Sequence, residues 1–290
     1  GGTSRTAQAA AKALGAAEIA VISRRGEDNY DNLSRHADTQ VLINTTPVGM
    51  FPHCGQSPVS LSLFPDLTGV LDVVYNPLHT ALLLEAEARG LPCSCGLPML
   101  VAQAKRAAEL FTGASIPDSR TEEILAGLTA QLRNIVLIGM PGCGKTAIGS
   151  ALAALLGRRF VDLDALIVEK AGKPIPDIFA QEGEAAFREL EHEIVREAGM
   201  AAGCVISTGG GVVTRQDNYA PLHQNGVIFH LVRDLALLPS DGRPVSQSTD
   251  LGLLWERREP LYAAFADRAV DNNGALEETL GQIKKELETL

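Results

Sequence analysis

Along the first 112 residues, apolar positions recur with two different periods, which predicts alternating strands and helices. Strand-length apolar runs occur at residues 18–23, 41–44 and 70–74. Helical spacing of apolar residues occurs at 8–14, 79–89 and 97–112. This alternation is typical of a parallel, doubly wound α/β sheet.

A second series of elements begins further along the chain. Residues 112–118 are rich in Gly, Pro and Ser, and an amphipathic helix is predicted over 119–132. A new buried-type strand at 135–138 then opens another run of strands and helices. We therefore expect two α/β domains, over residues 1–133 and 134–290, with the boundary near Arg133 and Asn134.

Composition fits a folded protein and narrows its partners. The 290 residues are long enough for two ordinary domains, and 46% of them are hydrophobic and 21% charged. The net charge of −10 argues against a nucleic-acid-binding surface, because such surfaces need clustered Lys and Arg. The longest apolar stretches are too short to cross a membrane.

The cysteines point to a cytoplasmic protein with reduced thiols. There are five, an odd number, and they are scattered along the chain. Cys93 and Cys95 form a C-x-C, but no second Cys or His pair lies at zinc-finger spacing. Free thiols in a reducing compartment are therefore expected rather than a metal site.

The most specific motif lies at the start of the second series. Residues 139–146 read Gly-Met-Pro-Gly-Cys-Gly-Lys-Thr and match G-x-x-x-x-G-K-[ST], between the apolar strand and a predicted helix over 147–156. In such a loop the glycines let backbone N–H groups face phosphate oxygens. Lys145 reaches the outer phosphates and the Thr146 hydroxyl can bind Mg²⁺. A chance glycine-rich turn would not require this flanking strand and helix.

Later motifs are ambiguous when each is taken alone. Asp162 and Asp164 would project from one face of a strand, yet a strand end that caps a helix explains them as well. Glu184 and Arg188, four residues apart, fit a helix-surface ion pair. Three successive glycines, Gly209–Gly211, indicate backbone that something approaches closely, although a flexible loop is the simple alternative.

The order of the motifs is more informative. The P-loop is followed by D-x-D, G-E-x-x-F-R, the glycine triplet, Arg243-Pro244 in a loop and Arg258-Glu-Pro-Leu-Tyr262. Together they resemble the shikimate kinases over residues 134–290. The resemblance implies a P-loop NTPase-type parallel-sheet domain with a mobile lid, monomeric, using ATP and Mg²⁺, with shikimate as the acceptor.

The resemblance also implies roles for individual residues. The ATP phosphates would be held by Gly142, Cys143, Gly144, Lys145, Thr146 and Ala147. Thr146 and Asp162 would lie at the metal, and Lys145, Asp164 and Arg243 would carry out the transfer, with Arg243 supplied by the lid. Shikimate would contact Asp164, Arg188, Gly209, Gly210, Gly211 and Arg258, the two arginines holding its carboxylate.

One departure and three alternatives accompany this interpretation. The segment between residue 232 and Arg243 is short and lacks an upstream arginine that often covers adenine in the family, so purine selectivity stays open. The alternatives are another P-loop metabolite kinase, such as one acting on gluconate, an oxidoreductase, and a nucleotide-dependent regulatory module.

The amino-terminal half carries weaker signals of dinucleotide binding. Gly1–Ala7 reads as the end of a glycine-rich turn entering a helix, and Arg24 and Arg25 follow about twenty residues later, where arginines favour the 2′-phosphate of NADP. With residues 44–50, 72–77 and 96–103, the half is similar to the NADP-binding domain of shikimate dehydrogenase. That resemblance implies NADP contacts from Thr3, Ser4, Arg5, Arg24 and Arg25, with Tyr75 facing the nicotinamide and Gln103 touching shikimate.

In that family, the catalytic lysine and its aspartate partner belong to a substrate domain, which these 290 residues do not contain. The first nucleotide-binding strand is missing too, so we expect an incomplete Rossmann-type domain. We expect this half to bind NADP weakly and to be an inactive remnant of a dehydrogenase from a bifunctional parent.

Overall fold

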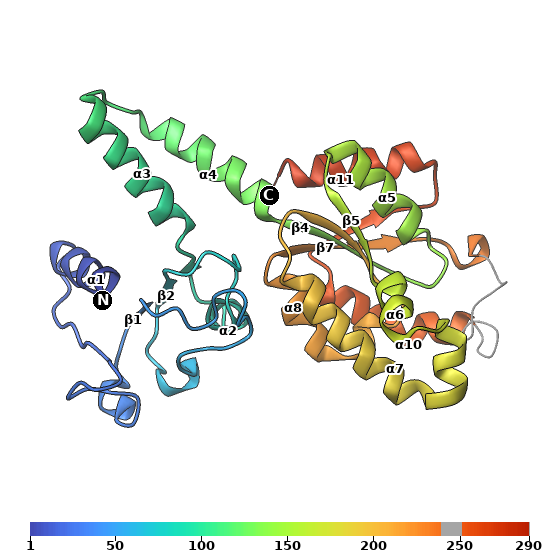
Figure 1. Ribbon diagram of the computed structural model, residues 1–290, viewed down its shortest axis with the longest axis horizontal. Helices are drawn as coiled ribbons and strands as arrows, with labels where there is room; N and C mark the ends of the chain where they lie inside the picture. Colours follow the sequence, from blue (N-terminus) through green and yellow to red (C-terminus); the bar gives the residue numbers. More distant parts are fainter. Residues whose placement is uncertain (239–250, 290) are drawn as a thin grey trace. The chain divides into compact units, whose positions relative to one another are not determined.

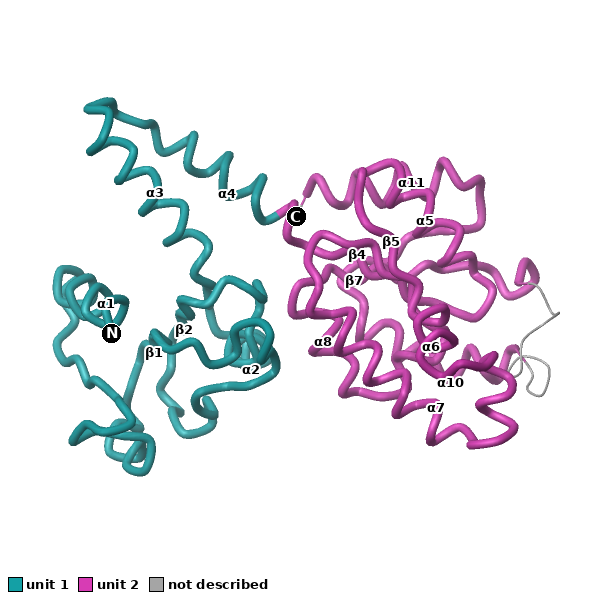
Figure 2. Tube along the Cα trace, in the orientation of Figure 1, with its two compact units in different colours: residues 1–129 teal, residues 130–290 magenta. Residues whose placement is uncertain are grey.

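The computed structural model describes residues 1–238 and 251–289. The chain folds as two compact units, Gly1–Thr129 and Ala130–Leu290 (Figure 2). Each unit has its own parallel sheet and its own cluster of buried apolar side chains.

The first unit is built on a three-stranded parallel sheet with the order β1-β2-β3. Its strands are β1 (Val41–Asn44), β2 (Gly69–Asp72) and β3 (Cys93–Ser94). Its helices are α1 (Gly2–Ala13), α2 (Ala81–Ala88) and α3 (Leu97–Thr112), and α4 (Asp118–Leu132) begins in this unit and ends beyond the boundary at Thr129. In register, Val41 pairs with Gly69 and Val70 pairs with Cys93. α2 is the most buried of these helices, with Leu82, Leu83 and Ala86 in the core.

The strand predicted over residues 18–23 does not form, so this prediction was wrong. Ile19 and Val21 are 39% and 42% exposed, and α1 buries none of its residues. A strand exists only where its N–H and C=O groups pair with a neighbour, and within the described residues this sheet ends at β1. An apolar run alone therefore could not decide the secondary structure here.

The second unit has a five-stranded parallel sheet with the order β5-β6-β4-β7-β8. The strands are β4 (Asn134–Ile138), β5 (Arg159–Asp162), β6 (Cys204–Ser207), β7 (Gly226–Val232) and β8 (Arg268–Asp271). The main helices are α5 (Lys145–Leu156), α6 (Leu163–Ala171), α7 (Ile175–Gly199), α8 (Tyr219–His223), α10 (Leu251–Phe265) and α11 (Leu276–Leu287). Figure 1 shows α5 and α11 on one face of the sheet and α7, α8 and α10 on the other.

Burial on both faces explains the sequence of the central strand. Every residue of β4 is buried, and a strand covered by helices on both sides reads as a continuous apolar run. Because all five strands are parallel, their carboxyl ends lie at one edge of the sheet. In open α/β sheets ligands bind at this edge. The glycine-rich loop and the glycine triplet follow strands at this edge, and Asp162 is the last residue of β5.

Candidate active site

The glycine-rich loop after β4 has the backbone shape of a phosphate cradle. Gly142 and Gly144 adopt φ values of 88° and 96°, in the left-handed region that favours glycine, and Gly144 caps α5. Lys145 begins the helix and is 6% exposed. Its Nζ donates to the carbonyl oxygens of Gly139 at 2.8 Å and Met140 at 3.0 Å. The ammonium therefore lies against the loop itself.

Thr146 and Asp162 form a pair of oxygen ligands next to this loop. The Thr146 hydroxyl donates to Asp162 Oδ2 at 2.8 Å, and Asp162 Oδ1 accepts from the backbone N–H of Asp164 at 3.0 Å. A hydroxyl and a carboxylate beside a phosphate cradle are the hard oxygen ligands that suit Mg²⁺. The residues present therefore fit that ion.

The two aspartates do not share a strand face, and of the two interpretations of the motif the structure confirms the strand end that caps the next helix. β5 ends at Asp162, which caps α6, and Asp164 lies in the first turn of that helix. The Asp162 side chain accepts from two orphan N–H groups at the start of α6, so capping ends the strand two residues earlier than expected. Asp164 still reaches the site, because its Oδ1 lies close to where a Gly209 side chain would be.

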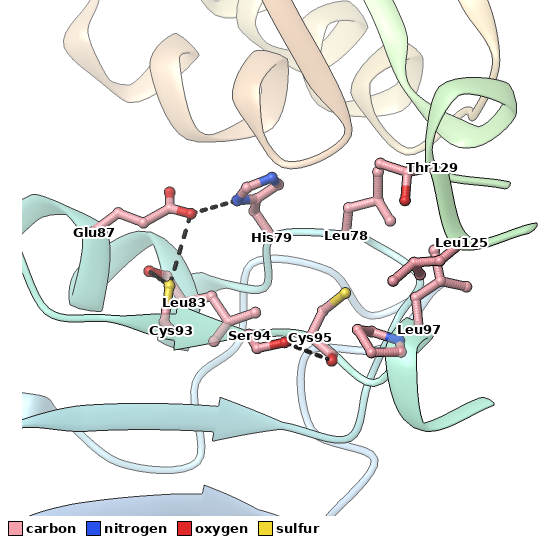
Figure 3. Close-up of a pocket in the computed structure, with 11 residues that line it drawn as sticks. Leu78, His79, Leu83, Glu87, Cys93, Ser94, Cys95, Leu97, Leu125 and Thr129 are labelled. Carbon is pink, nitrogen blue, oxygen red and sulfur yellow. Dashed lines mark hydrogen bonds and ion pairs between the residues drawn. The ribbon is translucent and has the colours of Figure 1, made fainter. Parts of the chain in front are cut away.

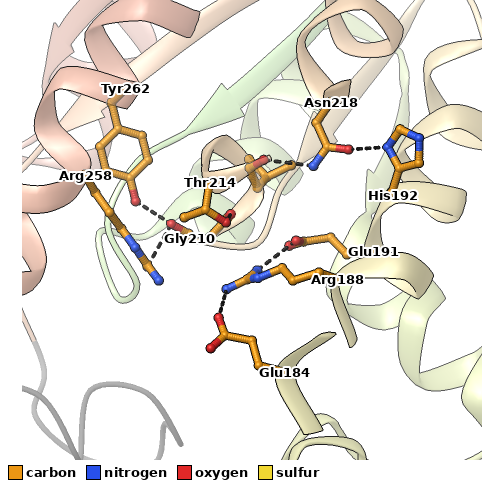
Figure 4. Close-up of polar contacts among 11 residues, drawn as sticks. Glu184, Arg188, Glu191, His192, Gly210, Thr214, Asn218, Arg258 and Tyr262 are labelled. Carbon is orange, nitrogen blue, oxygen red and sulfur yellow. Dashed lines mark hydrogen bonds and ion pairs between the residues drawn. The ribbon is translucent and has the colours of Figure 1, made fainter. Parts of the chain in front are cut away.

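Arg188 lies on α7 between two carboxylates (Figure 4). Its guanidinium pairs with Glu191 at 2.7 Å and with Glu184 at 3.1 Å. The predicted pair with Glu184 forms on the exposed side. The partner on the buried side, Glu191, was missed by sequence reasoning. Glu191 is 1% exposed and is the one charged residue among the buried positions of α7. A carboxylate on an apolar helix face was the signal that could have revealed it.

Burial makes the Glu191 carboxylate an unusual group. Burial raises its pKa, and the neighbouring Arg188 guanidinium partly offsets that rise. One oxygen, Oε2, accepts from Arg188, while Oε1 has no hydrogen-bond partner within the described structure. Oε1 lies beside Gly209. The pair therefore fixes the guanidinium and leaves a carboxylate oxygen facing the turn after β6.

Each glycine of the triplet is crowded by a different neighbour. A side chain at Gly209 would meet the Asp164 and Glu191 carboxylates, and one at Gly210 would meet the Pro141 ring of the glycine-rich loop. A side chain at Gly211 would overlap the Arg188 guanidinium. The close approach indicated by the sequence is thus real, and this turn connects the phosphate loop to α7.

Arg258 reaches the same turn from α10. This side chain is 7% exposed, and its Nη1 donates to the Gly210 carbonyl at 3.0 Å. The Tyr262 hydroxyl donates to the same oxygen at 2.5 Å (Figure 4). Burial raises the pKa of Tyr262, so it remains a donor. Two guanidinium groups therefore lie at the turn, while Arg243 lies outside the described residues.

The first unit holds a separate cavity of about 170 Å³, which is lined in part by the residues of β3 (Figure 3). Its polar groups are Cys93, Cys95, Ser94, Thr129 and a His79–Glu87 pair at 2.6 Å. Burial and the Glu87 carboxylate raise the pKa of Cys93 to about 11, so this thiol stays protonated. Within residues 1–238 and 251–289, no group of three or more His, Cys, Asp or Glu side chains could hold a metal ion.

Arg24 and Arg25, expected at a 2′-phosphate, are both exposed at a surface recess that Ser23 also lines. They follow segment 18–23, which forms no strand, whereas Thr3, Ser4 and Arg5 lie at the start of α1. In the part of the chain that the structure describes, no helix is both long and apolar enough to span a bilayer.

Most of the second unit matches a known protein family in sequence. The family model described as shikimate kinase matches residues 141–288. This chain belongs to the shikimate kinase family. A shikimate kinase of Moorella thermoacetica is 44% identical over 149 residues, which are 49% of this chain and 86% of the relative. One of Parasynechococcus marenigrum is 43% identical over 140 residues, 45% of this chain and 73% of the relative. The chain is thus an enzyme of the kinase type, and shikimate kinases use ATP and Mg²⁺.

Part of the chain is also similar to a solved structure outside the kinase family. A chorismate mutase/shikimate 5-dehydrogenase fusion protein from Clostridium acetobutylicum is 33% identical, with a TM-score of 0.41. The match covers 44% of this chain and 51% of that protein. The chain thus spans about half the length of that fusion protein.

Proposed function

We propose that residues 134–290 transfer the terminal phosphoryl group of ATP to the 3-hydroxyl of shikimate, giving shikimate 3-phosphate and ADP. The observation that carries this is the pair of guanidinium groups, Arg188 and Arg258, at the turn after β6, beside the phosphate loop. Two arginines next to a phosphate cradle suit a small acceptor that bears a carboxylate. Neutral sugars would not need both.

Each part of the site has a distinct task in this proposal. Arg188 and Arg258 hold the acceptor carboxylate, and the Gly209–Gly211 backbone lies along the ring. Asp164 accepts a hydrogen bond from the hydroxyl that is phosphorylated and orients its oxygen for attack. Glu191 keeps the Arg188 guanidinium in position through the 2.7 Å ion pair. Because these contacts orient the acceptor when it binds, less entropy is lost in the transfer step itself.

The nucleotide side of the site supplies charge. The N–H groups of residues 142–147 bind the phosphates, and Thr146 and Asp162 would hold Mg²⁺, which neutralises phosphate charge when bound. Lys145 leaves the Gly139 and Met140 carbonyls, which it contacts in this structure, to reach the outer phosphates. We propose that Arg243 also stabilises the charge that develops during transfer. We propose that the kinase unit works as a monomer.

The test is ADP formation by the purified chain with and without shikimate. We expect shikimate to stimulate ADP release strongly, and Arg188→Ala to raise the KM for shikimate by about 10- to 150-fold, because a charged hydrogen bond contributes roughly 1.5–3 kcal/mol. Arg215→Ala, which removes an exposed ion pair with Glu189 elsewhere on the unit, is the control. Equal ADP release without shikimate, or a preference for gluconate over shikimate, would contradict the proposal.

We also propose that residues 1–133 derive from the NADP-binding domain of a shikimate dehydrogenase and do not reduce dehydroshikimate in this 290-residue chain. Support comes from segment 18–23, which forms no strand, so that Arg24 and Arg25 are exposed and do not follow a strand of the sheet. NADPH oxidation with dehydroshikimate should therefore stay at the level of the blank. Turnover comparable with that of a complete dehydrogenase would refute this.

A further inference from the structure

The residue after β8, Asn272, has a buried side chain that contacts the backbone of the phosphate loop. Asn272 follows β8 and is 3% exposed. Its backbone N–H donates to the Val232 carbonyl at 2.8 Å, which ties it to the end of β7. Its side-chain Nδ2 donates to the backbone carbonyl of Cys143, which is 129 residues away in sequence. Cys143 lies between Gly142 and Gly144, two positive-φ glycines of the loop.

A second buried residue fixes the Asn272 amide. Thr279 lies on α11, beside α5, and is 1% exposed (Figure 1). Its hydroxyl donates to Asn272 Oδ1 at 3.0 Å. Because a backbone carbonyl only accepts hydrogen bonds, the amide must present its NH₂ to Cys143, which leaves its oxygen for Thr279. The chain of donors therefore runs in one direction, from Thr279 through Asn272 to Cys143.

This contact sets the direction of the next peptide N–H. A trans peptide is planar, so the Cys143 carbonyl and the Gly144 N–H point to opposite sides. With the carbonyl held against Asn272, the Gly144 N–H points away from Asn272. In a P-loop, N–H groups at this position face the nucleotide phosphates, and Gly144 also caps α5, whose amino end favours anions.

We propose that Asn272 is a positioning residue for the nucleotide. By holding the Cys143 carbonyl, Asn272 pre-orients the Gly144 N–H toward the β-phosphate, and Thr279 in turn orients Asn272. The loop then binds phosphate without first rotating a peptide, which would cost affinity. This inference rests on the proposed ATP use of the site, but nucleotide binding tests it without any phosphoryl transfer.

The experiment compares ADP with AMP, which lacks the β-phosphate, by calorimetric titration of the full chain. In Asn272→Ala we expect ADP to bind about tenfold more weakly, a change of about 1.4 kcal/mol in binding free energy. The affinity for AMP should change less than twofold. Asn272→Asp has nearly the same shape but cannot donate to the carbonyl, so it should weaken ADP binding at least as much. In steady-state assays the KM for ATP should rise while the KM for shikimate stays unchanged.

The matched control is Asn134→Ala. Asn134 is 1% exposed, and its amide also holds a backbone carbonyl, that of Ala201 at 2.7 Å, but at the amino end of β4. This variant should lower thermal stability and leave the ADP-to-AMP affinity ratio unchanged. Thr279→Val should weaken ADP binding more mildly than Asn272→Ala. Thr279→Ser, which keeps the hydroxyl, should bind ADP as the unmodified chain does.

The outcomes are separable. If Asn272→Ala weakens ADP and AMP equally, or leaves ADP affinity unchanged, the proposal is wrong and Asn272 is only a structural residue. If Asn272→Ala does not fold, Thr279→Val, which keeps Asn272, is tested in its place. A Thr279→Val protein whose ratio of ADP affinity to AMP affinity is unchanged would contradict the proposal. If the chain binds ADP as predicted but shikimate does not stimulate ADP formation, the acceptor assignment fails and the role of Asn272 stands.

Discussion

At the scale of residues, a methyl group added at Gly211 should weaken acceptor binding and leave nucleotide binding nearly unchanged. Gly211 has φ −105° and ψ 1°, which alanine can adopt, and the atoms nearest to a side chain there belong to the Arg188 guanidinium. We expect Gly211→Ala to displace that guanidinium and to raise the KM for shikimate about tenfold, with the KM for ATP changed less than twofold. Steady-state kinetics with each substrate varied in turn measures both values.

A double-mutant cycle tests the stated cause. In the Arg188→Ala background the guanidinium is gone, and Gly211→Ala should then produce no further rise in the KM for shikimate. Independent, additive effects of the two substitutions would show that Gly211 acts by some route other than Arg188.

At the scale of elements, α7 consists of two helical segments that meet at Gly183. This residue has φ 84° and ψ 172°, a conformation that is essentially restricted to glycine, and a side chain there would meet no other atom. Gly183→Ala should therefore lower the free energy of unfolding by about 1–3 kcal/mol through backbone strain alone. Urea denaturation of the kinase unit measures the change.

Gly281 supplies the matched control for this backbone effect. It lies inside α11, also with open space around its Cα, but within regular helix. Gly281→Ala should raise the free energy of unfolding by about 0.4–1 kcal/mol, because alanine restricts the unfolded chain. Changes of the same sign in both variants would contradict the assignment of strain to Gly183.

At the scale of the whole molecule, the two units have separate apolar cores of very different size. A larger core buries a greater share of its surface and is expected to be more stable. Calorimetry of the full chain should therefore show two transitions, with the first unit unfolding at the lower temperature. ADP and shikimate should raise only the upper transition, and each ligand at 100 times its Kd should add about 2.7 kcal/mol of stability.

NADP⁺ provides the complementary measurement on the same sample. Because Arg24 and Arg25 are exposed and follow a segment that forms no strand, NADP⁺ at millimolar concentration should leave the lower transition unchanged. A clear rise in that transition would show that the first unit binds the dinucleotide well. A single transition that all three ligands shift would instead show that the two units unfold together.

The sequence by itself determined the features that depend on neighbours along the chain. The glycine-rich loop, the apolar strand β4 that precedes it and the Glu184–Arg188 pair all follow from local patterns, whereas β8 was not predicted. The order of the motifs was enough to indicate the shikimate kinase family, which the comparisons established.

Only the tertiary structure decided features that depend on residues far apart in the chain. Segment 18–23 looks like a strand but has no pairing neighbour. Glu191 looks like an ordinary helix carboxylate until burial places it against Arg188. Asn272 shows no sign of its contact with Cys143 across 129 positions. Local spacing sets backbone conformation, whereas burial and hydrogen-bond partners are set by packing between elements, which no local pattern encodes.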